Sequence, residues 1–203
     1  MVTLESILSH TADHLVLVVM TLIISICISM PLAFGSLYNK RFGYVVTKFA
    51  NLAQAVPSFA VVALVVPLMG IGFYPAVVAI LLRALLPIIK NTYIGLSTVD
   101  PSMLDYADGI GLNEWQILRY VRLPNAYPAI FAGIKFAFIL INSIAILTAY
   151  IGSGGLGELI FQGLVAFNNE KILAGAIPAI LIAIAFDIIF TRIERKLTPH
   201  YRK

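Results

Sequence analysis

The chain has 203 residues, of which 60% are hydrophobic and only 12% are charged. A soluble domain is nearer half apolar and a quarter charged, and a chain of this length has too little interior to bury so much apolar surface. The composition therefore indicates an integral membrane protein and excludes a soluble enzyme or a disordered tail. A disulfide scaffold is excluded too, because Cys27 is the single cysteine.

Five segments are apolar enough and long enough to cross a bilayer, which takes about 20 residues. They cover residues 15–37, 49–69, 73–90, 127–151 and 172–190. The apolar runs are continuous rather than alternating, which favours helices. With no internal repeat visible, we expect one all-α transmembrane domain of five helices over residues 1–203.

The positions of Lys and Arg predict the orientation of this domain. The loops 38–48, 90–125 and 192–203 hold 11 of the 14 basic residues, whereas the opposite side holds only Lys171. Basic loops stay in the cytoplasm. This rule puts the N-terminus outside and the C-terminus inside, and it explains the net charge of +4 without nucleic-acid binding.

The second predicted span contains Pro57, flanked by Gln54 and Ser58. A proline and two polar side chains could break this helix beside a solute path, as discontinuous helices do in transporters. A simple kink packed against a neighbouring helix explains the same residues equally well.

The loop after the third span is about 35 residues long, and loops of that length are usually functional. Asp100 and Pro101 predict the start of a short helix that ends near Ala107. Asn113, with Gln116 three residues later, predicts a second helix that Pro124 ends. We expect a pair of amphipathic helices over 101–123, joined by a glycine turn. Helices lying on lipid headgroups are the plainer alternative.

The segment 152–163 has glycines at 152, 154, 155, 157 and 163. Clustered glycines allow positive φ angles and close backbone approach. We interpret Gly152, Gly154, Gly155 and Gly157 as part of an external gate or docking surface, because an apolar stretch follows them. A flexible connection is the alternative.

Three charged residues, Arg83, Lys135 and Asp187, fall inside predicted spans, where an unpaired charge is unfavourable. All three lie in the predicted cytoplasmic half of the membrane. We therefore expect Asp187 to pair with Arg83 or Lys135. A structural ion pair is favoured over a role in the solute path.

Catalytic chemistry is not indicated. The chain lacks a P-loop, so we expect no ATP binding here. We expect no metal site either, because the histidines are only His10, His14 and His200. Tyr74, Tyr93 and Phe73 do not suggest an aromatic cage for a cation, and aromatic residues near the span ends, among them Tyr150, are interpreted as an interfacial belt.

The loop carries a recognisable pattern of residues. Asp105-Tyr106-Ala107, Gly111 and Val121-Arg122-Leu123-Pro124 have the spacing of the "EAA" loop, and the chain resembles the permeases of ABC importers. The first residues depart from that consensus, with Asp105 for Glu and Tyr106 for Ala. The resemblance implies that the loop docks on a cytoplasmic ATPase through Asp105 and Ala107. It also implies that Gly111 forms the turn and that Val121, Leu123 and Pro124 anchor the return to the membrane.

Other segments narrow the resemblance. Those at 54–58, 67–72, 86–93 and 151–157 are similar to permeases of importers for osmoprotectants such as glycine betaine, choline or carnitine, and methionine-importer permeases share the loop and the glycine-rich segment. The resemblance implies a methionine-permease-like fold, a second permease subunit, two cytoplasmic ATPase subunits that bind ATP and Mg²⁺, and an extracytoplasmic solute-binding protein.

Two alternatives remain open. The first is a permease of a related importer for an amino acid such as methionine or for another betaine-like solute. The second is a membrane scaffold or a membrane enzyme without an ATPase partner.

Overall fold

The computed structural model describes residues 2–197, which form helices and no strand. The long helices are α1 (Leu4–Tyr38), α4 (Phe73–Ser97), α7 (Leu123–Thr148) and α9 (Asn169–Leu197). Shorter helices lie between them: α2 (Lys40–Ala55), α3 (Ser58–Met69), α5 (Pro101–Gly109), α6 (Glu114–Ile117), a π-helix (Leu118–Arg122), a 3₁₀ turn (Ala149–Ile151) and α8 (Leu156–Val165). Of the basic and histidine residues discussed above, His200, Arg202 and Lys203 lie outside the described residues.

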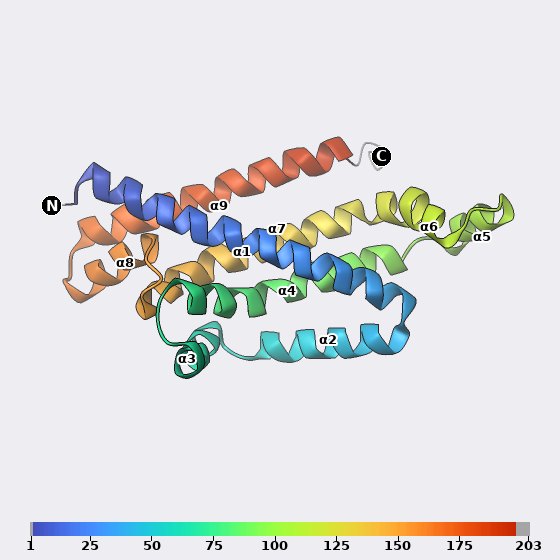
Figure 1. Cartoon of the computed structure of the whole chain (residues 1–203). Helices are drawn as coiled ribbons and strands as arrows, with labels where there is room; N and C mark the ends of the chain where they lie inside the picture. Colours follow the sequence, from blue (N-terminus) through green and yellow to red (C-terminus); the bar gives the residue numbers. More distant parts are fainter. Residues whose placement is uncertain (1, 198–203) are drawn as a thin grey trace.

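The helices form an elongated bundle with two distinct ends (Figure 1). One end, called here the α8 end, contains α8, α3 and the starts of α1, α4 and α9. The other, called the loop end, contains α5 and α6. The chain enters α1 and α4 at the same end, so α2 must carry it back between them, antiparallel to both (Figure 1).

The predicted second span, 49–69, is not one helix. Four helical stretches within residues 2–197 are long and apolar enough to cross a membrane, and this segment is not among them. It is divided between α2 and α3 at Val56 and Pro57, both of which have extended ψ angles near 130°. Proline at 57 disfavours the helical conformation at Val56 and supplies no N–H to continue the helix.

The core lies between α4 and α7, which approach closely through two glycines. A Cβ at Gly95 would lie 2.8 Å from the Cβ of Ala129, and one at Gly133 would lie 2.8 Å from the carbonyl oxygen of Pro87. Both distances are shorter than ordinary contacts. In a membrane, where association depends on packing rather than on exclusion of water, such close approach stabilises helix pairs.

A buried polar contact joins three helices near the α8 end. His14 of α1 is fully buried, and its Nε2 lies 3.2 Å from Oδ1 of Asn142 on α7. The Asn142 amide in turn donates to the carbonyl oxygen of Ala179 on α9 at 3.3 Å. Buried polar groups need such partners, so this contact fixes the relative position of α1, α7 and α9.

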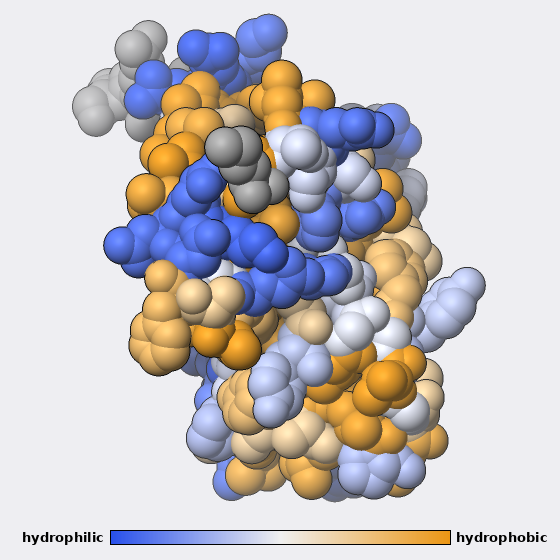
Figure 2. All heavy atoms as spheres, turned by 90° about the vertical axis from the view of Figure 1, so that its left-hand side faces the viewer, coloured by the Kyte–Doolittle hydropathy of each residue, from blue (hydrophilic) through white to orange (hydrophobic). Residues whose placement is uncertain are grey.

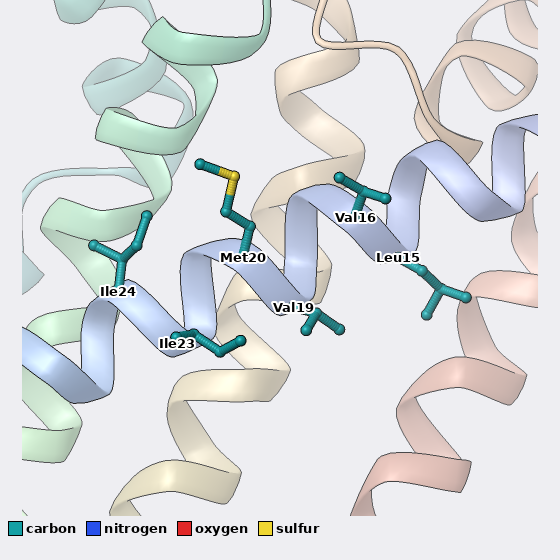
Figure 3. A pocket seen from close by; sticks show the side chains of 6 residues that line it. All are labelled: Leu15, Val16, Val19, Met20, Ile23 and Ile24. Atoms are coloured by element: carbon teal, nitrogen blue, oxygen red, sulfur yellow. The ribbon is translucent and has the colours of Figure 1, made fainter.

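The surface is largely apolar along the bundle. On α1, six apolar side chains line a shallow groove of about 560 Å³ (Figure 3): Leu15, Val16, Val19, Met20, Ile23 and Ile24. This groove offers no polar group to hold a solute. Because α1 is long enough to span a bilayer, lipid chains are the natural neighbours of these side chains.

Candidate functional site

The first helix of the loop, α5, begins as the sequence predicts. The Asp100 carboxylate accepts hydrogen bonds from the Ser102 backbone N–H at 2.9 Å and from the Ser102 hydroxyl at 2.8 Å. These bonds lower the pKa of Asp100 below its usual value, since they favour the charged form. Pro101 occupies the first turn, where its missing N–H is of no consequence.

Gly111 makes the turn between α5 and α6. Its φ angle is +79°, a conformation that favours glycine. The Gly111 N–H donates to the carbonyl oxygen of Asp108 at 2.9 Å, and the Leu112 N–H donates to that of Ala107 at 3.1 Å. The turn is therefore a defined structure rather than a flexible link.

The predicted capping box at the start of α6 is confirmed. The Gln116 N–H donates to Oδ1 of Asn113, and the Asn113 N–H donates to Oε1 of Gln116, each at 2.9 Å. This reciprocal pair satisfies two backbone donors that the first turn would leave unpaired. The start of α6 is thus fixed by hydrogen bonds within its own first turn.

The prediction that Pro124 ends the helical unit is wrong. From Glu114 to Ile151 the chain is helical throughout, through a π-turn at Leu118–Arg122 into α7. The Leu123 N–H donates to the carbonyl oxygen five residues back, at Leu118. Pro124 falls in the first turn of α7, where a helix tolerates proline, and the Asn125 amide donates to the Val121 carbonyl oxygen at 2.7 Å.

One side chain ties this continuous helix to its neighbour. Nη1 of Arg122 donates to the carbonyl oxygen of Leu96 at 2.7 Å. That carbonyl lies in the last turn of α4, where helical carbonyls lack intrahelical partners. The π-turn is therefore attached both to α7, by chain continuity, and to the end of α4, by this bond.

The loop end presents side chains of mixed character. Asp105 is exposed, as are Tyr106, Ile110 and Trp115, with 77%, 77% and 66% of their surfaces accessible. Ala107 is buried within the loop, with 4% exposure. Large apolar side chains so exposed beyond the membrane-spanning helices are typical of an interaction surface.

Arg83 binds the backbone at the break between α2 and α3. Nη1 of Arg83, on α4, donates to the carbonyl oxygens of Gln54 at 3.1 Å and Val56 at 2.6 Å. These carbonyls belong to the end of α2, where the helical ladder stops at Pro57. The guanidinium thus satisfies acceptors that the break exposes, and Pro57 is more than a simple kink.

The glycine-rich segment is ordered and only partly a loop. Gly152, Gly154 and Gly155 have φ angles of +79°, +75° and +79°, whereas Gly157 lies inside α8. A Cβ at Gly157 would collide with the carbonyl oxygen of Ile146. The glycines therefore let α8 fold back against the end of α7, which a flexible connection would not require.

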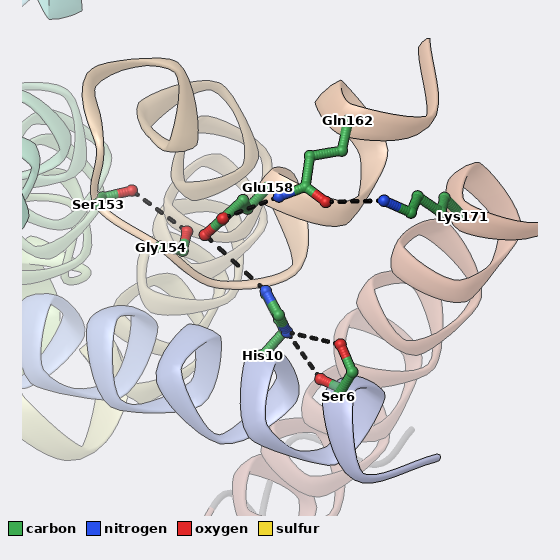
Figure 4. Close-up of polar contacts among 7 residues, drawn as sticks. All are labelled: Ser6, His10, Ser153, Gly154, Glu158, Gln162 and Lys171. Carbon is green, nitrogen blue, oxygen red and sulfur yellow. Dashed lines mark hydrogen bonds and ion pairs between the residues drawn. The ribbon is translucent and has the colours of Figure 1, made fainter. Parts of the chain in front are cut away.

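Polar side chains hold α8 against its neighbours (Figure 4). Nε2 of His10 on α1 lies 3.8 Å from Oε2 of Glu158 on α8. Nε2 of Gln162 donates to Oε1 of Glu158 at 2.9 Å, and Nζ of Lys171 on α9 donates to Oε1 of Gln162 at 3.1 Å. At the α8 end, these polar contacts thus connect α1 and α9 through α8.

The predicted pairing of Asp187 is wrong. Lys135 instead pairs with Glu194 at 2.9 Å and lies 3.4 Å from the Thr191 hydroxyl, while Asp187 is exposed on α9. Glu194 was overlooked because it lies beyond the predicted end of the span at 190. The helix continues to Leu197, so Glu194 still faces α7.

Sequence reasoning also missed Arg122 and the aromatic cluster described below. Arg122 follows Arg119 by three residues, and no sequence pattern distinguishes the one that bonds to α4 from the one that lies beside Tyr120. No group of three or more His, Cys, Asp or Glu side chains among residues 2–197 could hold a metal ion.

Two curated relatives cover nearly the whole chain. The glycine betaine/carnitine/choline transport system permease protein OpuCB of Bacillus subtilis (strain 168) is 38% identical over 192 residues, covering 95% of this chain and 88% of the relative. The osmoprotectant import permease protein OsmW of Salmonella typhimurium is 37% identical over 196 residues, covering 94% and 91%.

A solved structure shares the fold. The inward-facing MetNI methionine ABC transporter contains a chain that matches with a TM-score of 0.81 at 19% identity, covering 92% of this chain and 93% of that one. The profile of the family described as "Binding-protein-dependent transport system inner membrane component" matches residues 25–202. The chain therefore belongs to the family of inner-membrane components of binding-protein-dependent transport systems.

Proposed function

We propose that this chain is the permease subunit of an ATP-driven importer for small zwitterionic or quaternary-ammonium solutes. The observation that carries the proposal is the match of 37–38% identity, over 94–95% of the chain, to permeases named for glycine betaine, carnitine, choline and osmoprotectants. The helical pair at the loop end supports it, because an importer needs a surface on which a motor subunit can act.

Methionine is a weaker candidate for the solute. The MetNI structure is 19% identical, and that degree of likeness supports the fold alone. A scaffold or a membrane enzyme is weaker still, since the family consists of transport components.

We propose that α2 and α3 together make a fifth crossing. The chain leaves α1 at the loop end and enters α4 at the α8 end, so the broken pair returns it across the membrane (Figure 1). With the loop end in the cytoplasm, the N-terminus lies outside and α9 ends inside. The concentration of Lys and Arg in the loops at that end supports this orientation.

The helices at 101–123 serve as the coupling element. Two cytoplasmic ATPase subunits, which bind ATP and Mg²⁺, would engage the exposed Asp105, Tyr106 and Trp115, while Ala107 and Gly111 shape the pair from within. Because the chain is helical from Glu114 to Ile151, a displacement of α6 is transmitted directly to α7. Val121, Leu123 and Pro124 lie along this connection.

The solute path forms between two permease subunits, identical or not. The break at Gln54, Pro57 and Ser58 and the turn at Gly152, Gly154 and Gly155 both lie towards the α8 end, where an extracytoplasmic binding protein would deliver the solute. The turn is bonded to the connection between α3 and α4, since the Gly72 N–H donates to the Ile151 carbonyl oxygen at 2.7 Å.

Uptake in cells tests the proposal. The chain would be expressed with candidate ATPase and binding-protein subunits, in a strain without osmoprotectant importers, and supplied with labelled glycine betaine, choline, carnitine or methionine. We expect accumulation of at least one quaternary-ammonium solute, abolished when the ATPase is inactivated. Uptake of methionine alone would overturn the solute assignment.

A pull-down tests the coupling element separately. Asp105→Lys or Gly111→Pro should reduce recovery of the ATPase with the solubilised permease, because the first reverses a charge on the contact surface and the second requires a φ angle proline cannot adopt. Asp13→Lys, the same charge reversal at an exposed position of the α8 end, is the control. Equal recovery from all four proteins would argue against docking at this loop.

A further inference from the structure

An aromatic cluster lies at the α8 end, built from segments distant in sequence. The ring of Tyr150, on the 3₁₀ turn, has an edge contact with Phe59 of α3 at 5.8 Å between centroids and another with Phe161 of α8 at 5.8 Å. Tyr150 was interpreted above as an interfacial belt residue. The fold also brings its ring into edge contact with two other aromatic rings.

A pocket of about 330 Å³ opens beside this cluster, near the lower limit of the usual range for small-ligand sites of ~300–1,000 Å³. Tyr150 and Phe59 form its aromatic wall, and the remaining lining residues are aliphatic: Val62, Ala63, Val66, Ile71 and Ile151. The lining contains no charged side chain. A solute here would meet ring faces and methyl groups.

The position of Tyr150 is fixed by the backbone around it. The Ile151 carbonyl oxygen accepts from the Gly72 N–H at 2.7 Å, which attaches the turn to the segment between α3 and α4. The next residue, Gly152, has a φ angle of +79°, and the Ser153 hydroxyl donates to that of Thr148 at 3.0 Å. The ring therefore projects from a rigid turn while 69% of its surface remains exposed.

The chemistry of this wall suits one class of ligand. A quaternary ammonium group has no N–H to donate, so it is recognised by aromatic faces and by methyl contacts rather than by hydrogen bonds. A pocket that lacks both carboxylates and basic residues neither traps such a cation in an ion pair nor repels it. Weak binding of this kind suits a path that a solute must also leave.

Figure 2 shows the α8 end face-on. Hydrophilic residues gather across its middle, and mainly hydrophobic residues fill the lower part, on the side where α3 lies in Figure 1. Exposed apolar side chains of this region include Leu68, Ile71 and Tyr74, at 84%, 73% and 72% exposure. The aromatic cluster thus belongs to an apolar part of the end that receives the solute.

We propose that Phe59, Tyr150 and Phe161 form a transient site for the quaternary ammonium group of the solute within the permease itself. The proposal rests on the proposed function, and it adds a step: after the binding protein releases the solute, this aromatic wall receives the cationic head. Phe161 acts by packing its ring against that of Tyr150.

Transport by the reconstituted importer is the first test. Tyr150→Leu and Phe59→Leu should each reduce choline uptake about three- to tenfold, the range expected for loss of one cation–π contact, with ATPase recovery unchanged. Tyr150→Phe keeps the ring and should transport normally. Tyr74→Leu, at an aromatic residue of the same end that contacts Phe73 rather than the cluster, is the matched control.

Ligand binding without the binding protein is the second test. Saturation-transfer NMR on the detergent-solubilised permease–ATPase complex would use tetramethylammonium, choline and the uncharged choline isostere 3,3-dimethyl-1-butanol. We expect signals from both cations that Tyr150→Leu removes, and a much weaker signal from the alcohol. An equal signal from the alcohol would show an ordinary apolar pocket and overturn the proposal.

The uptake and NMR results distinguish an error in the aromatic site from an error in the proposed function. If the wild-type importer moves no quaternary-ammonium solute, the proposed function is wrong, whatever the NMR shows. If it moves choline, and the leucine variants assemble, transport and give NMR signals like wild type, the aromatic site is wrong and the proposed function stands. Should Tyr150→Leu fail to assemble, Phe59→Leu, on a different helix, decides the question.

Discussion

At the scale of single residues, the decisive positions are those where two helices approach too closely for a side chain. Gly133 on α7 faces the Pro87 carbonyl oxygen and Asn91 on α4, each 2.8 Å from the position of an added Cβ. Gly109, at the end of α5, has no heavy atom within 4 Å of the same position. The sequence does not distinguish these two glycines, yet only Gly109 has space for an added side chain.

Gly133→Ala should destabilise the protein by about 1–3 kcal/mol, because the new methyl group forces α4 and α7 apart. Gly109→Ala should leave stability unchanged or slightly raise it, since alanine is the better helix former. Thermal unfolding of the two solubilised variants measures the difference. Equal unfolding temperatures would show that the α4–α7 contact adjusts without penalty.

A second residue-scale prediction concerns the charge inside the bundle. Lys135→Met removes the cation that pairs with Glu194 between α7 and α9, while keeping a side chain of similar volume. Both side chains are 24% exposed, so a loss of about 1–2 kcal/mol is expected, between the values for surface and buried pairs. Asp187→Asn, at an exposed carboxylate of the same helix, should change stability little. A larger effect from Asp187→Asn would restore the pairing first predicted from the sequence.

At the scale of elements, the continuity of α6, the π-turn and α7 matters more than any one helix. The predicted stop at Pro124 would have left the coupling helices as a separate hinged unit. The structure instead joins α6 to α7 without a break and attaches this continuous helix to α4 through Arg122, while α5 is connected to α6 through the turn at Gly111. We expect such a connection to move α4 and α7 together when the loop end is displaced.

Arg122→Ala should therefore lower solute transport several-fold while ATPase recovery and ATP hydrolysis persist, since the loop still docks but no longer moves α4 directly. Arg119→Ala, one turn earlier and beside Tyr120, is the matched control and should transport normally. Transport and hydrolysis are measured on the same proteoliposomes. Loss of both activities together in Arg122→Ala would indicate a folding defect. Unchanged transport would show that Arg122 does not transmit the movement of the loop end to α4.

At the scale of the whole molecule, the number of crossings decides which surfaces face which compartment. Among residues 2–197, four helical stretches qualify as spans by length and apolar composition, and α2 and α3 return the chain along the bundle from the end of α1 to the start of α4. Because α2 and α3 share this return, neither helix needs as many apolar residues as a regular span. Arg83 supports it by satisfying the carbonyls freed at the break.

Single-cysteine labelling tests this topology. In a Cys27→Ser background, Asp105→Cys should react with an impermeant maleimide only from the cytoplasmic side, and Glu5→Cys, which α1, α2–α3 and α4 separate from it, only from outside. Both positions are exposed at opposite ends of the bundle. Reaction of the two from the same side would contradict the five-crossing arrangement, and reversed sidedness would contradict the orientation.

The sequence by itself determined the features that depend on local or one-dimensional information. Apolar run length identified the four long membrane helices, although it also joined 49–69 into one span. Side-chain capping at Asp100 and Asn113 located the starts of α5 and α6, and the spacing around Gly111 identified the family. Each of these depends on residues within one continuous segment of the chain. The family match and the hydrogen bonds of both caps confirm them.

Only the tertiary structure decided what depends on contacts between distant segments. The division of 49–69 at Pro57, the pairing of Lys135 with Glu194 and the meeting of Phe59 with Tyr150 each require knowing which helices are neighbours and how they are rotated. In a chain that is apolar almost throughout, hydrophobic periodicity carries little information on rotation, because lipid and core accept the same side chains. Packing at close-approach glycines such as Gly133, rather than the hydrophobic pattern, fixes which faces of α4 and α7 meet.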